Sequence, residues 1–135
     1  MSGLLVMPIV LPFATASLCM LLWRHARQQQ ITALIGSVAH LAVCLRLLSI
    51  VIGDGIQVSQ IGNWPAPFGI SLVCDHLSAL MIIITAIIGT ATALYARGES
   101  DDQMRAHGFH ALFHVLLGGL CGAFLAGDLF NLYVW

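Results

Sequence analysis

The stretch "LSALMIIITAIIGTATALYA", residues 77–96, contains twenty residues and no charged side chain. A helix needs about 20 mostly apolar residues to cross the hydrocarbon core of a bilayer, which is about 30 Å thick. The stretch therefore predicts a membrane-spanning helix. The apolar residues that precede it place the expected start of this helix near Leu72, so we expect it to cover residues 72–96.

The composition of the whole chain agrees with a membrane environment. Of its 135 residues, 59% are apolar and only 8% are charged, and lysine is absent. An ordinary soluble domain carries about 25% charged residues. The formal net charge is −1, so no basic surface for nucleic acid is expected. The sequence therefore predicts an integral membrane protein.

Further apolar runs predict the rest of the fold. Residues 4–23, 31–52 and 107–126 are each long enough to span a bilayer, and residues 129–135 supply only the start of another helix. We expect Pro8 and Pro12 to bend the first helix without ending it. The prediction is an all-α integral membrane protein with four transmembrane helices and the start of a fifth, in one membrane domain over residues 1–135.

Arginine placement predicts the orientation. Arg24 and Arg27 lie between the first two spans, Arg97 and Arg105 lie between the next two, and the N-terminus and residues 53–69 have none. Cytoplasmic loops are enriched in Arg and Lys. We therefore expect both arginine-bearing loops in the cytoplasm and the N-terminus outside.

The long loop between the second and third spans has two strand-like runs, at residues 56–61 and 68–73. The segment between them contains Pro65 and Pro67, which suit a connection because proline cannot donate a ladder hydrogen bond. A short extracytoplasmic hairpin is one interpretation, and an unstructured interfacial loop with Trp64 among the headgroups is the other.

Two charged residues near the outer side are candidates for an ion pathway. Arg46 lies within the second span, where an isolated charge is costly, and Asp75 opens the third span from the same side. An Arg46–Asp75 ion pair is one hypothesis. The alternative is that Arg46 extends alone to the headgroups.

The fourth predicted span carries a stripe of polar and small residues. His107, His110 and His114 fall on one helix face, which continues through Gly118 and Gly122. A G-x-x-x-G pair allows another helix to approach closely, so this face is expected to point into the protein. His110 and His114 are candidates for a proton pathway, and structural hydrogen bonding is the alternative. Neither this stripe nor the scattered Cys19, Cys44, Cys74 and Cys121 predicts a metal site; the cysteines are expected to be small buried packing residues.

Three stretches carry a family resemblance: "PIVLP" (residues 8–12), "GNWPAPFGISLVCDHLSALM" (62–81) and "FHALFHVLLGGLCGAFLAGDLFNLYVW" (109–135). Together they resemble the D subunit of multisubunit monovalent cation/proton antiporters of the Mrp type. That subunit is similar to the antiporter-like subunits of respiratory complex I and of membrane-bound hydrogenases. Asp75 and Asp128 match aspartates of the family motifs, and Asp128 is also well placed to cap the helix that follows it.

The resemblance implies a transporter subunit of the bacterial inner membrane, which exchanges Na⁺ or another monovalent cation for protons without an organic cofactor. Its partners would be the other membrane subunits, the transported ions and the lipid bilayer. In the family, a membrane-embedded glutamate follows the motif that ends this chain, so we expect an N-terminal fragment with no catalytic residue of its own. The alternatives are a proton-pumping subunit of an NADH–quinone oxidoreductase or hydrogenase, and a small structural or assembly protein.

Overall fold

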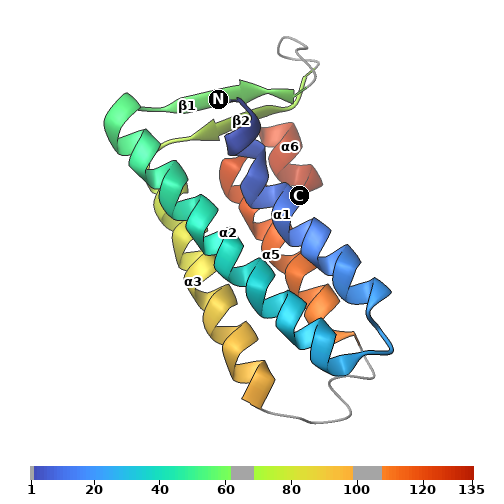
Figure 1. Ribbon diagram of the computed structural model, residues 1–135. Helices are drawn as coiled ribbons and strands as arrows, with labels where there is room; N and C mark the ends of the chain where they lie inside the picture. The colour runs from blue at the N-terminus through green and yellow to red at the C-terminus, as the bar shows by residue number, and fades with distance from the viewer. Residues whose placement is uncertain (1, 62–68, 99–107) are drawn as a thin grey trace.

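A computed structural model describes residues 2–61, 69–98 and 108–135. Its elements follow in the order α1 (Ser2–Leu21), α2 (Ala26–Asp54), β1 (Gln57–Gln60), β2 (Ser71–Cys74), α3 (His76–Gly98), α5 (Phe109–Leu125) and α6 (Leu129–Val134). Figure 1 shows the four longer helices side by side in alternating directions, with the two strands and α6 gathered at one end of the bundle.

Three of the described helices, α1, α2 and α3, are long and apolar enough to cross a membrane, and α5 is a shorter apolar helix. The helix α2 begins five residues before the apolar run and includes Gln28, Gln29 and Gln30. A helix continues wherever its backbone hydrogen bonds continue, whereas hydropathy marks only the part suited to hydrocarbon. α1 runs through both Pro8 and Pro12, as expected.

The expected start of the third helix near Leu72 is wrong. Residues Ser71–Cys74 form β2, and α3 begins at His76. β2 pairs antiparallel with β1, with Val58 opposite Val73. The hairpin interpretation of this region is therefore correct for the strands, while Trp64, Pro65 and Pro67 lie outside the described residues.

The exterior of the bundle is apolar. Large aliphatic side chains on every long helix are more than half exposed, among them Leu18, Ile35, Ile88 and Leu112. So continuous an apolar surface is unfavourable in water but is compatible with contact with lipid tails. The protein is therefore an all-α membrane protein apart from its short hairpin.

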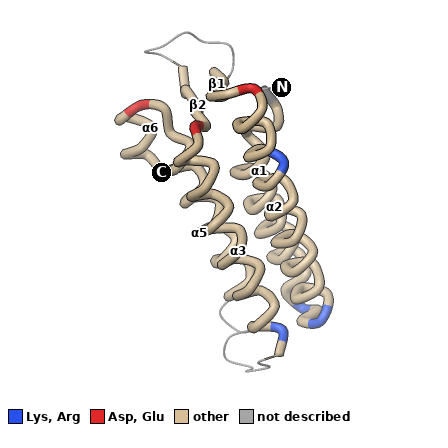
Figure 2. The backbone as a smooth tube through the Cα atoms, turned by 90° about the vertical axis from the view of Figure 1, so that its left-hand side faces the viewer, with Lys and Arg blue, Asp and Glu red and all other residues tan. Residues whose placement is uncertain are grey.

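Charged residues occupy the ends of the bundle (Figure 2). Among the described residues, Arg24, Arg27 and Arg97 lie at the end away from the hairpin, and three aspartates lie at the hairpin end. Arg46 is the exception, since it lies partway along α2 with an exposed side chain.

The buried glycines of α5 allow close packing. A Cβ atom at Gly118 would lie 2.9 Å from Cε2 of Phe13 on α1, and one at Gly122 would overlap the Trp135 ring. The neighbouring Gly119 faces open space, since a Cβ atom there would meet no atom within 4 Å. Phe13 and Trp135 also lie close to each other, with ring centroids 6.5 Å apart.

We expect Gly118→Val to destabilise the protein by about 1–3 kcal/mol, because the added side chain forces Phe13 and α1 away from α5. The matched control is Gly119→Val, which places the same side chain in open space and should change stability by less than about 0.5 kcal/mol. Thermal unfolding of the purified protein, followed by fluorescence-detected size exclusion, measures both. Equal losses in the two variants would contradict this account of the α1–α5 contact.

Candidate functional site

Asp75 caps the first turn of α3. Its Oδ1 accepts a hydrogen bond from the backbone N–H of Ser78 at 2.7 Å. This bond holds the pKa of the Asp75 carboxyl below its ordinary value. No ion pair joins Asp75 to Arg46 in the described part of the chain, so the hypothesised pair is absent here. The Arg46 side chain is exposed on α2.

Asp128 caps α6 in the same way. Its Oδ1 accepts a hydrogen bond from the backbone N–H of Asn131 at 2.8 Å, and its Oδ2 accepts one from the Asn131 side chain. The backbone N–H of Asn131 is the main reason that the pKa of Asp128 lies below its ordinary value. Both aspartates thus satisfy helix-end amides at the hairpin end of the bundle.

His114 is buried in α5 and is held at both ring nitrogens. Nδ1 lies 2.8 Å from the carbonyl oxygen of His110, and Nε2 lies 3.2 Å from the hydroxyl of Ser37 on α2. Because a carbonyl oxygen can only accept, Nδ1 carries the hydrogen, and in the neutral ring Nε2 accepts from Ser37. One ring nitrogen therefore meets a backbone carbonyl and the other meets a side-chain hydroxyl.

The contact extends to α3 through Thr90. Its hydroxyl lies 3.2 Å from the Ser37 carbonyl oxygen and 2.8 Å from the Ala86 carbonyl oxygen, so one hydrogen is shared between two acceptors. His110 is also buried, and its ring meets Phe109 edge-on with centroids 5.5 Å apart. His107, the remaining member of the histidine stripe, lies outside the described residues.

His40 is a site residue that sequence reasoning missed. Its side chain is only 1% exposed. Its Nε2 lies 3.4 Å from Sγ of Cys121, while Nδ1 has no hydrogen-bond partner in the described part of the molecule. His40 follows Ser37 by about one turn on α2, whereas Cys121 follows His114 by two turns on α5, so no matching spacing in the sequence marks this contact.

We call this row of contacts the α2–α5 seam, defined by Ser37, His40, His114 and Cys121. Its four side chains are buried among apolar neighbours. The seam brings two ionisable rings into the interior of the bundle, where an ionisable residue is expensive and is therefore a candidate functional group. Asp75 and Asp128 lie apart from it, at the hairpin end.

The four cysteines are free and buried, which confirms the expectation that they are packing residues. Cys19 also takes part in a link between the first two helices, since its carbonyl accepts a hydrogen bond from the Gln29 side chain at 2.9 Å.

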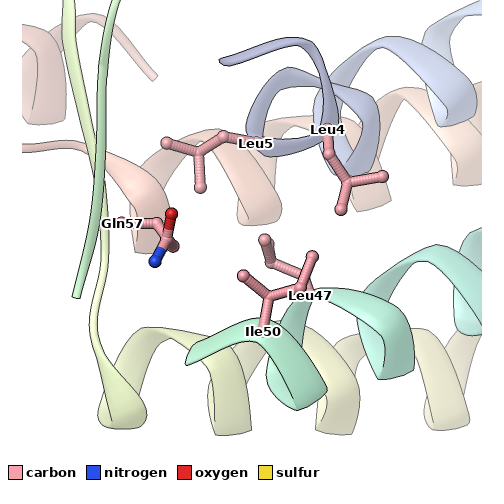
Figure 3. Close-up of a pocket in the computed structure, with 5 residues that line it drawn as sticks. All are labelled: Leu4, Leu5, Leu47, Ile50 and Gln57. Atoms are coloured by element: carbon pink, nitrogen blue, oxygen red, sulfur yellow. The ribbon is translucent and has the colours of Figure 1, made fainter. Parts of the chain in front are cut away.

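Two hollows lie among the described helices. One cavity of about 30 Å³ lies near the hairpin, lined by Leu4, Leu5, Leu47, Ile50 and Gln57 (Figure 3). A cavity of this size has room for a water molecule. A wider groove between α1 and α5 is lined only by apolar and glycine residues, so it offers no polar side chain to orient a ligand.

The fold and the seam together define a class: a multi-pass helical membrane protein with protonatable residues buried between its helices. Proteins that are similar to this chain indicate which family within this class it resembles. The D subunit of an Na⁺/H⁺ antiporter from Alkalihalophilus pseudofirmus is 36% identical over the whole chain, which covers 27% of that relative. The D subunit of a "probable" K⁺/H⁺ antiporter from Rhizobium meliloti is 44% identical over 98% of the chain and 25% of its own length. The resemblance to the antiporter D subunit is therefore confirmed.

Solved structures agree. A chain of the Mrp complex from Dietzia sp. DQ12-45-1b superposes with a TM-score of 0.86 at 25% identity, over 96% of this chain and 24% of that one. A chain of an archaeal membrane-bound sulfane sulfur reductase superposes with a TM-score of 0.87, also at 25% identity, over 96% and 27% of the two chains. No family model matches the sequence. The chain spans about a quarter of the length of the relatives that it matches.

The two aspartate caps predict a pH dependence at the hairpin end. A carboxyl whose pKa is lowered by folding stabilises the folded state above its unfolded pKa, and this contribution is lost as the pH falls through the folded pKa. We therefore expect the amide protons of Ser78 and Asn131 to be protected from hydrogen exchange at neutral pH and to lose protection below about pH 4. Hydrogen exchange measured by mass spectrometry and corrected for the intrinsic rate tests this.

The controls are Asp75→Asn and Asp128→Asn, which remove the titrating carboxyls. The asparagine Oδ1 can still accept the backbone hydrogen bond, so each variant should keep its own helix start protected and lose only the pH dependence, and the other helix start should be unchanged. Loss of protection at the same pH in the wild type and in the matching variant would contradict the assignment.

Proposed function

We propose that the chain is the N-terminal part of a membrane subunit that exchanges a monovalent cation, Na⁺ or K⁺, for protons, and that it works in a complex with other membrane subunits. The observation that carries this proposal is the similarity of the whole chain to the D subunits of cation/proton antiporters. The buried histidines of the α2–α5 seam support it, because a proton carrier needs ionisable groups within the membrane.

The proposal assigns a topology. Helices α1, α2, α3 and α5 cross the membrane, and α6 begins a fifth crossing. The N-terminus, the hairpin and Asp128 lie on the extracytoplasmic side of a bacterial inner membrane. The supporting observation is that Arg24, Arg27 and Arg97 gather at the other end of the bundle, since arginine favours the cytoplasmic side.

A redox-coupled proton pump is the second candidate. It is favoured by the likeness to a chain of the sulfane sulfur reductase, which is a respiratory membrane complex. In that case the same helices would move protons while electron transfer in other subunits supplied the energy. The antiporter remains the first candidate because the curated relatives carry antiporter names.

Cysteine labelling tests the topology. Gly3 and Gly98 lie near opposite ends of the bundle, and a Cβ atom at either meets no atom within 4 Å, so Gly3→Cys and Gly98→Cys should both be tolerated. In a background whose four native cysteines are replaced by alanine, a membrane-impermeant maleimide should label position 3 in intact cells and position 98 in everted vesicles. The reverse pattern would overturn the orientation.

Transport is tested in everted vesicles from cells that lack their own antiporters. The complete protein with its companion subunits should give recovery of a pH-dye signal on addition of NaCl or KCl, with choline chloride as the control. The 135-residue chain alone should give none, because the buried residues that the structure describes include no carboxylate at mid-depth to hold a cation. Failure of the complete complex to respond to either cation would contradict the antiporter proposal, and a response from the short chain would contradict its incompleteness.

A further inference from the structure

Arg46 is a charged residue at membrane depth with no partner among the described residues. Its side chain is exposed on α2, and its guanidinium forms no ion pair or hydrogen bond with any residue that the structure describes. It lies six residues inside the end of the apolar run 31–52, which is about 9 Å along the helix axis. A charge at this depth is costly alone, so charged residues within membrane helices are usually paired.

None of the described carboxylates pairs with Arg46. Asp54 ends α2 eight residues later, about 12 Å further along the axis. Asp75 and Asp128 cap the starts of α3 and α6. The remaining acidic residues of the sequence follow the last residue of α3, whose end lies away from the hairpin: Glu99, Asp101 and Asp102. The counter-charge of Arg46 is therefore expected from outside this chain.

The direction of α2 disfavours a lipid phosphate as this counter-charge. The helix runs from the arginine end of the bundle toward the hairpin (Figure 1). In an α-helix the Cα–Cβ bonds tilt toward the N-terminus, and long side chains lie over the preceding turn. The Arg46 side chain therefore leaves α2 toward the middle of the bilayer, and it has to turn back to reach the nearer headgroups. A carboxylate on a neighbouring helix requires no such reversal.

The surface around Arg46 is suited to another helix. We call it the Arg46 face and define it by five exposed or half-buried residues at alternating intervals of three and four along α2: Ala39, Ala42, Arg46, Ser49 and Gly53. This spacing places them in one row, as in the seam of a coiled coil. All except Arg46 are small, and small residues allow two membrane helices to approach closely. A Cβ atom at Gly53 would meet no atom within 4 Å, so this part of the row is open.

The exposed face of α3 is different. It carries large aliphatic side chains that are about half exposed: Leu80, Ile84, Ile87 and Ile88. Long, flexible side chains of this kind suit contact with lipid tails and contain no group that needs a partner. The face of α3 is therefore a natural control for the Arg46 face.

The position of α6 indicates which protein supplies the partner helix. In the proposed complete subunit the chain continues from α6, which packs against α5. Figure 2 shows α6 and α2 on opposite sides of the bundle. The Arg46 face also lies on the side of α2 opposite to its buried residues, among them His40, Cys44 and Leu47. The next helix of the same subunit thus begins on the far side, and the Arg46 face is left for a companion subunit.

We propose that the Arg46 face docks a transmembrane helix of a companion subunit, and that this helix carries an aspartate or glutamate that pairs with Arg46. The inference rests on the proposed function for the assembly with other membrane subunits, and it adds the surface and the chemistry of the partner. A guanidinium can bind a carboxylate through two parallel hydrogen bonds. In hydrocarbon little water competes for either charge, so the pair holds the two helices at one depth.

Photo-crosslinking in the assembled complex tests the surface. The residue p-benzoylphenylalanine replaces Leu45, a large exposed residue at the rim of the Arg46 face, or Ile88 on α3 as the matched control. Irradiated membranes should give an adduct of this subunit with a companion subunit from position 45, in at least fivefold higher yield than from position 88. Equal yields, adducts with lipid alone, or a crosslink within the same subunit would each overturn the proposal.

Substitution of Arg46 tests the charge. Arg46→Leu should lower the amount of companion subunit that co-purifies at least threefold, whereas Arg46→Lys should retain most of it. Arg46→Leu should still reach the membrane at the wild-type level, because its side chain contacts no described carboxylate. The control is Arg24→Leu, an exposed arginine between α1 and α2, which should leave co-purification unchanged. Unchanged co-purification in Arg46→Leu would overturn the ion pair.

A charge exchange identifies the partner residue. Peptide mapping of the adduct locates the partner helix, and each acidic residue on it is replaced by arginine. One of these replacements combined with Arg46→Glu should restore the co-purification that either change alone reduces, and no restoration at any acidic residue would contradict the pair.

These readouts require no transport. A complex that gives the expected adduct but no cation-dependent exchange would reject the antiporter and leave the docking surface intact. Exchange without the adduct would reject the docking surface alone.

Discussion

Hydrocarbon offers no hydrogen bonds, and this constraint shapes the whole molecule. Every backbone amide at membrane depth must find its partner within the protein, which is why the long apolar runs are helical. The hairpin follows from the same constraint at the end of the bundle. Its strands pair with each other, and the backbone N–H of Gly127 donates to the Ser71 carbonyl at 2.9 Å. A Cβ atom at Gly127 would lie 2.9 Å from that carbonyl oxygen, so glycine permits the contact.

Side chains between the helices obey the same constraint with few exceptions. Buried hydroxyls donate to carbonyls of the preceding turn, as Thr15 does to Leu11 and Thr85 to Met81. The Gln29 side chain reaches Cys19 across the turn between α1 and α2. Against this background the unpaired nitrogen of His40 is conspicuous. Departures from local satisfaction in natural proteins gather at functional or strained sites.

Sequence reasoning succeeded where one physical quantity decided the outcome. Hydropathy located the helices, because the apolar runs that hydrocarbon requires are visible in the chain itself. It misplaced the start of α3, since Leu72, Val73 and Cys74 are apolar in either a strand or a helix and only the partner strand distinguishes them. Helix caps were predictable from residue type, as Asp128 illustrates. Whether Arg46 pairs with Asp75 could not be predicted, because pairing depends on how α2 is rotated about its axis. No local pattern specifies that rotation.

The α2–α5 seam shows why the candidate site needed three dimensions. His110 and His114 were visible as a stripe, but the stripe alone could not reveal what they face. Ser37 supplies the partner of one ring, and a proline on α1 leaves free the carbonyl beside the other. In structural terms, the pattern "PIVLP" predicted only a bend in α1. Its second consequence is chemical: each proline removes the donor for a carbonyl one turn earlier, and in a buried helix that carbonyl is left available to a neighbouring side chain. A motif that shapes one helix can thereby set the chemistry of another.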